Sequence, residues 1–166
     1  MSYDGRAVAN YILDFCTEKN RRITNLALQK IIYFCHVWTL IELHRPLVKQ
    51  DFEAWQFGPV LQHVYREFKD FDKHPINRRA IRLDRKTGDL VVVEYDFDAE
   101  LTALLPRIVD FYSQMGAGDL VEISHVVGGP WDMVWNHAAP INPGMIIDNE
   151  LILEFYSRSP EQFPIQ

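Results

Sequence analysis

Residues 24–44 read TNLALQKIIYFCHVWTLIELH, and this stretch decides the fold. Apolar side chains fall on nearly every side of a helix drawn through it, which is typical of a helix buried at the centre of a domain. Pro46 follows and ends the helix. The polar side chains of Gln29, Tyr33 and His36 lie within one narrow arc at ~100° per residue. Polar groups in a buried helix need internal partners, so we expect this stripe to meet the corner at residues 55–59 and the segment of His125 and Trp131 in one internal polar cluster.

The next informative stretch is residues 52–60, which read FEAWQFGPV. It predicts an extended aromatic segment that ends at Gly58. Pro59 is then expected in the first turn of a helix, because glycine is tolerated as a cap and proline fits that turn without losing a hydrogen bond. Apolar residues recur every three or four positions from Leu61 to Phe71, which predicts a helix there.

The remaining chain predicts short helices and one hairpin. A helix is expected from after Asp4 to near Asn20, a β-hairpin within residues 81–95, and a long helix capped by Asp98. Pro106 should kink that helix or delay its start. Further short helices are expected at 119–126, around 130–135 and after Asp148. The fold class is therefore mostly α with a small β-hairpin (α+β), a single compact helical domain at 1–158 around a buried central helix, with a short flexible C-terminal tail at 159–166.

The charge balance weighs against nucleic acid. The net charge is −6, whereas a duplex binder needs a clustered excess of Lys and Arg, so nucleic acid is an unexpected partner. One basic cluster stands apart: Arg78, Arg79, Arg82, Arg85 and Lys86. This cluster is either a solvated hairpin whose charges prevent aggregation, or a contact for an acidic partner or for RNA.

Compartment is predicted from cysteine usage and apolar runs. Cys16 and Cys35 both lie in helical apolar patterns, so we expect buried, reduced thiols and a cytoplasmic protein. The first residues lack the pattern of a secretion signal. The most apolar run, 31–43, contains His36 and Glu42 and is interpreted as too short and too polar to span a bilayer.

No catalytic or metal motif emerges from spacing. Ser124-His125 and Cys35-His36 are sequence neighbours, which point about 100° apart on a helix and rarely face each other. A composite metal site from His36, His125, His137 and Asp132 stays open, as does an acid–base set of His125 with Asp132 or Tyr33. We expect no cofactor.

Three ordered segments carry a family resemblance. They are residues 24–34 (TNLALQKIIYF), residues 52–60 with Val64-Tyr65, and residues 120–125 (LVEISH) followed by Pro130-Trp131. Together they resemble the Panacea domain family, the SocA-like and GepA-like antitoxins of bacteria and phages. The resemblance spans essentially the whole chain.

The resemblance implies a mostly helical antitoxin without enzymatic activity or cofactor. Its expected partner is the toxin encoded beside it, which it neutralises by direct contact, and some relatives deliver the toxin to an ATP-dependent protease as adaptors. The matching residues are predicted to form one polar and aromatic cluster, either structural or partner-binding, and the structural role is the one we favour. They are Gln29, Lys30, Tyr33, Trp55, Gly58, Pro59, Tyr65, His125, Pro130 and Trp131.

Overall fold

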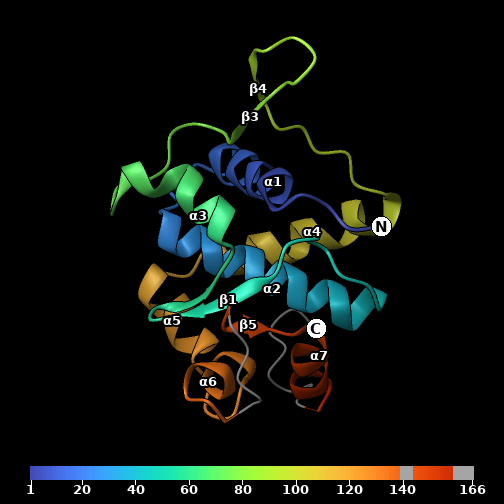
Figure 1. Cartoon of the computed structure of the whole chain (residues 1–166), viewed down its shortest axis with the longest axis vertical. Helices are drawn as coiled ribbons and strands as arrows, with labels where there is room; N and C mark the ends of the chain where they lie inside the picture. The colour runs from blue at the N-terminus through green and yellow to red at the C-terminus, as the bar shows by residue number, and fades with distance from the viewer. Residues whose placement is uncertain (139–143, 159–166) are drawn as a thin grey trace.

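The computed structural model describes residues 1–138 and 144–158. The helix α2 (Asn25–Leu43) runs through its middle (Figure 1). Every side chain from Ala27 to Leu40 is buried. Around α2 pack the helices α1 (Gly5–Glu18), α3 (Gln62–Phe68), α4 (Ala99–Tyr112), α5 (Ala117–Ser124) and α7 (Asn149–Ser157). The predicted central helix is therefore confirmed.

Helix α2 also corrects one expectation. By length and composition alone Asn25–Leu43 could cross a membrane, contrary to the interpretation of the run 31–43 as too short and too polar. However, 78 % of its apolar window is buried inside the fold. A core helix of a globular domain has the same composition, so this segment provides the centre of the hydrophobic core.

Side-chain caps explain where α1, α2 and α4 begin. The Thr24 hydroxyl accepts from the N–H of Ala27 at 3.2 Å, which starts α2, and His44 ends it in the left-handed conformation with φ 57°. Asp98 caps α4, as predicted, and Asp4 caps α1, which starts after it as expected. Pro106 lies inside α4 and does not delay its start.

A small antiparallel sheet lies against α2, and the sequence analysis did not foresee it. Strand β1 (Phe52–Trp55) pairs with β2 (Gly58–Val60) on one side and with β5 (Ile146–Ile147) on the other. The prediction that Pro59 opens a helix is wrong, because Trp55 pairs with Gly58 across a two-residue turn. Gly58 has φ +117° and belongs to a strand, and α3 begins only at Gln62.

The predicted hairpin is confirmed and projects beyond α1 (Figure 1). It consists of β3 (Ile81–Leu83) and β4 (Leu90–Val92), paired antiparallel. Its base is held by Asn10 of α1, which is fully buried. The Asn10 amide donates to the carbonyls of Ala80 and Val93 at 3.0 and 2.8 Å and accepts from the Ala80 N–H at 2.7 Å.

The remaining elements are short. The 3₁₀ turn η1 (Lys69–Phe71) extends α3, and α6 (Pro130–Trp135) packs against β1, β5 and α7. The molecule is thus an α+β domain of mainly helical content, as predicted. The tail predicted at 159–166 lies outside the described residues.

Candidate functional site

The centre of the family-motif cluster is a buried lysine. Lys30 of α2 has no exposed surface, and its Nζ donates to the carbonyl of Pro59 at 2.9 Å. Burial lowers the pKa of Lys30 to about 7, because an ammonium loses hydration inside the protein. A Cβ on Gly58 would stand 2.5 Å from Lys30 Cε and 2.8 Å from Ser124 Oγ. Glycine at 58 therefore meets two demands, a positive φ and room for the lysine.

The second tie is made by the amide of Gln29, one residue earlier on α2. Its Oε1 accepts from the N–H of Leu61 at 3.0 Å, at the junction between β2 and α3. Its Nε2 donates to Asn25 Oδ1 at 3.0 Å, and the Asn25 amide donates to the Tyr65 carbonyl at 3.1 Å. The β2–α3 segment is thus fastened to α2 at successive points by side chains that would be costly to bury unpaired.

The third motif segment closes the cluster from α5 and α6. The indole N–H of Trp131 donates to the Trp55 carbonyl at 2.7 Å. The ring of His125 stacks on Trp131 with centroids 3.6 Å apart and planes 1° apart. Burial, and then the charge of Lys30, lower the pKa of His125. Trp55 in turn meets Tyr65 edge to face at 5.0 Å, and Pro130 is the buried first residue of α6.

The polar stripe of α2 does not converge on one point. Lys30 contacts strand β2, and Gln29 contacts the junction that follows it. The rings of Tyr33 and His36 instead pack against Phe52, each with its centroid within 5.3 Å of the Phe52 centroid. His36 Nδ1 accepts from the N–H groups of Leu47 and Val48, each at 3.3 Å. Its Nε2 therefore carries the proton and donates to Asn149 Oδ1 at 2.7 Å.

Burial explains the protonation states in this second group. It lowers the pKa of His36 to about 4, and it raises the pKa of the Tyr33 hydroxyl, which neighbours Tyr156. Both side chains are thus neutral near pH 7.

The catalytic and metal alternatives find little support in this geometry. The Asp132 carboxylate accepts from the Gly128 N–H at 2.9 Å and from the Asn136 amide at 2.7 Å, so both oxygens are used within its own turn. Within residues 1–138 and 144–158, no three His, Cys, Asp or Glu side chains gather as a metal site would require. The composite site of His36, His125, His137 and Asp132 is therefore wrong; His36 binds Asn149 instead.

The basic cluster divides into two parts. Arg78 pairs with Glu67 at 2.9 Å and lies over the rings of Phe68 and Phe71, and Arg79 pairs with Asp14 at 2.6 Å. These two arginines belong to the body of the domain. The exposed hairpin carries the other three, which are Arg82, Arg85 and Lys86.

Sequence reasoning missed three residues of this network. Asn25 and Ser124 lie within the motif segments but were not among the ten residues expected to form the cluster, and Asn149 binds His36 across 113 residues of chain. The spacing of Asn25 and Gln29, four residues apart on one helix, was a usable signal. No local pattern predicts the role of Asn149, because this residue lies outside the motif segments, at the start of the last described helix, α7.

Comparisons with known proteins agree with these motifs. A family model described as "Antitoxin SocA-like, Panacea domain" matches residues 28–132. The protein "Antitoxin SocA" of Caulobacter vibrioides (strain NA1000 / CB15N) is 42 % identical over 135 residues, which are 81 % of this chain and 72 % of that protein. No solved structure matches the chain. The matched range contains most of α2, the β1–β2 turn and the stacked pair His125 and Trp131.

Proposed function

This chain belongs to the SocA-like antitoxin family of Panacea domains, and from that premise we propose that it neutralises a partner toxin by direct protein–protein binding. The observation that carries the proposal is the 42 % identity to an antitoxin across most of both chains. The packing supports it, because hydrogen bonds from α2 and α6 hold the motif segments together as a fixed framework. A preorganised framework loses little conformational entropy when it binds.

Co-expression with the toxin candidate encoded beside the gene tests this proposal. Expression of the neighbour alone should arrest growth, and co-expression should restore growth and yield a complex that co-purifies. A harmless neighbour, or rescue without a complex, would contradict the proposal for that pair.

Stoichiometry separates binding from catalysis. A binding antitoxin protects only up to the amount of toxin it can occupy, whereas an enzyme acting through His125 would protect when present in small amounts. We therefore expect purified antitoxin to abolish the toxin's effect in a reconstituted assay near equimolar ratio. Protection at a small fraction of that ratio would favour the enzymatic alternative.

A finer part of the proposal concerns toxin turnover. We propose that the chain also delivers the bound toxin to an ATP-dependent protease, as the family resemblance implies for some members. Toxin half-life, followed after translation is stopped, should shorten only when both the antitoxin and the protease are present. If the toxin half-life is unchanged while growth is still rescued, the delivery proposal is wrong and the antitoxin acts by binding alone. The two free, buried thiols of Cys16 and Cys35 support a reducing cytoplasmic setting for this activity.

A further inference from the structure

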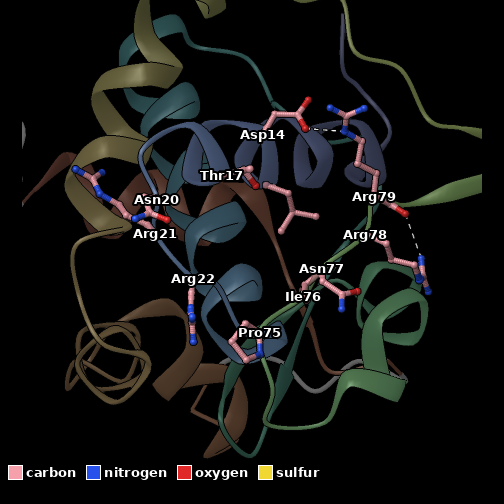
Figure 2. A pocket seen from close by; sticks show the side chains of 11 residues that line it. Asp14, Thr17, Asn20, Arg21, Arg22, Pro75, Ile76, Asn77, Arg78 and Arg79 are labelled. Atoms are coloured by element: carbon pink, nitrogen blue, oxygen red, sulfur yellow. Dashed lines mark hydrogen bonds and ion pairs between the residues drawn. The ribbon is translucent and has the colours of Figure 1, made fainter.

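A groove of about 450 Å³ opens between the end of α1 and residues 75–79 (Figure 2). It lies on the body of the domain, beneath the base of the β3–β4 hairpin. None of the motif residues of the family line it. Its lining consists of Leu13, Asp14, Thr17, Asn20, Arg21, Arg22, Pro75, Ile76, Asn77, Arg78 and Arg79.

Backbone hydrogen bonds fix the walls of this groove. After α1 the chain turns through Asn20, with φ 57°, and the Arg21 N–H returns to the Cys16 carbonyl at 2.7 Å. The opposite wall is tied to the same loop, because the Ile76 N–H donates to the Ile23 carbonyl at 2.8 Å. The groove is therefore preformed, which favours binding of an extended segment.

Arginines are concentrated along this groove. The whole chain has a net charge of −6, and four arginines line the groove. Three of them are ion-paired, to Asp110, Glu67 and Asp14, so within the described residues Arg22 carries the unpaired positive charge. Asp14 is the one carboxylate of the described lining. That carboxylate is already occupied, since it accepts from Arg79 Nε at 2.6 Å and from the Tyr95 hydroxyl at 2.8 Å. Figure 2 shows Arg79 reaching Asp14 over α1.

The arginines are positioned by internal bonds but keep donors to spare. Arg21 uses Nη1 for Asp110 and Ser113, at 2.8 and 2.9 Å. Arg22 is exposed and has no ion-pair partner within the part of the chain that the structure describes. A guanidinium offers five N–H donors in a planar fork that matches a carboxylate. The groove can therefore bind carboxylates without breaking its own ion pairs.

We propose that this groove binds an acidic segment of the partner protein, with an apolar side chain resting on Leu13 and Ile76 between carboxylates held by the arginines. This proposal rests on the proposed antitoxin function and names the face that meets the toxin. Single-stranded nucleic acid fits less well, because the described lining has no aromatic ring on which a base could stack.

Charge reversal at two matched positions tests the proposal. Arg22→Glu changes the groove, and Arg85→Glu changes the hairpin turn; both side chains are exposed and neither has an ion pair within the described residues. We expect Arg22→Glu to weaken the complex with the co-expressed toxin by about tenfold or more, and Arg85→Glu to leave it near wild type. Thermal unfolding of both variants should match wild type.

The outcomes separate failure of this proposal from failure of the proposed function. If wild type neither rescues growth nor binds the toxin, the antitoxin proposal fails for that pair. If wild type binds and Arg22→Glu binds equally well, the groove proposal alone is overturned. Stronger loss in Arg85→Glu would move the contact to the hairpin.

A toxin-free assay gives a second reading. The probe is a short fluorescent peptide in which glutamates flank leucine, compared with the same peptide carrying lysines and with a short single-stranded RNA. Wild type should bind only the glutamate peptide, and Arg22→Glu should lose that binding. Equal binding by both variants, or preferential binding of RNA through Arg22, would overturn the proposal.

Discussion

The side-chain nitrogen of Lys30 donates to the carbonyl of Pro59 across 2.9 Å in the middle of the core. This contact joins the central helix to strand β2 and explains two features at once. It gives the buried Pro59 carbonyl a hydrogen-bond partner. The lysine side chain also fills the space that any side chain on Gly58 would need. The motif segments 24–34 and 52–60 are thus one structural unit.

Lys30 should make stability depend on pH. Its folded pKa of about 7 lies below its ordinary value of 10.5, so between these values the unfolded chain binds more protons than the folded one. Stability from this group therefore rises with pH above 7. In Lys30→Met that contribution is absent. Between pH 7 and pH 9 the free energy of unfolding of wild type should therefore rise by about 2 kcal/mol more than that of the variant. Urea unfolding of both proteins across this range measures it, and parallel pH profiles would contradict it.

Gly58→Ala should destabilise the fold strongly. The substitution places a Cβ 2.5 Å from Lys30 Cε at a backbone φ of +117°, and we expect a loss of about 2–4 kcal/mol. Gly118→Ala is the matched control, because that glycine lies in α5 with no atom within 4 Å of a new Cβ. It should gain about 0.5–1 kcal/mol through helix propensity. Chemical denaturation measures the free energy of unfolding of both variants. Equal values would contradict the prediction, because they would mean that the fold accommodates a Cβ at position 58 without cost.

His36 should make the domain sensitive to acid. Its folded pKa of about 4 lies below the ordinary 6.5, so its contribution is complete above pH 6.5 and is lost as pH falls towards 4. From pH 7 to pH 5 the free energy of unfolding of wild type should fall by about 1–2 kcal/mol more than that of His36→Gln. Glutamine retains an acceptor for the Leu47 and Val48 N–H groups but does not titrate. Urea midpoints at both pH values provide the measurement, and an equal loss in both proteins would refute the role of His36.

Asn10 should stabilise the base of the β3–β4 hairpin. In Asn10→Leu, the buried Ala80 N–H and the carbonyl of Val93 lose a partner, at a cost of about 2–4 kcal/mol. Hydrogen exchange should accelerate most at residues 80–93. Asn77→Leu, at an exposed position of the neighbouring segment, serves as the control and should change little. Uniform acceleration over the whole chain would instead indicate that Asn10 supports the core and not the hairpin.

The accuracy of sequence reasoning followed the range of the interactions. Residues 24–44 and the caps Asp4 and Asp98 were predictable, because periodicity and capping are local signals. Gly58 was misread as a helix cap because its strand pairing with Trp55 and its φ of +117° were not recognised. The demand for space made by Lys30 comes from 28 positions earlier. Strand β5 has two residues and exists only through its pairing with β1, so no pattern of its own announces it. The groove at Arg22 joins two segments more than 50 residues apart, which no local pattern could bring together.

The indole of Trp131 provides the test of whether the motif cluster is structural or a partner contact. Trp131→Phe keeps an aromatic ring beside His125 but removes the N–H that binds the Trp55 carbonyl. We expect a loss of about 1–2 kcal/mol in stability. Trp135 is 38 % exposed and stacks on Trp131 with ring centroids 5.7 Å apart. Trp135→Phe keeps that ring contact and should stay within about 0.5 kcal/mol of wild type. If the cluster is structural, the fraction of Trp131→Phe that remains folded should bind toxin with wild-type affinity, as measured by titration calorimetry. A weakened affinity at unchanged stability would assign Trp131 to the toxin interface instead.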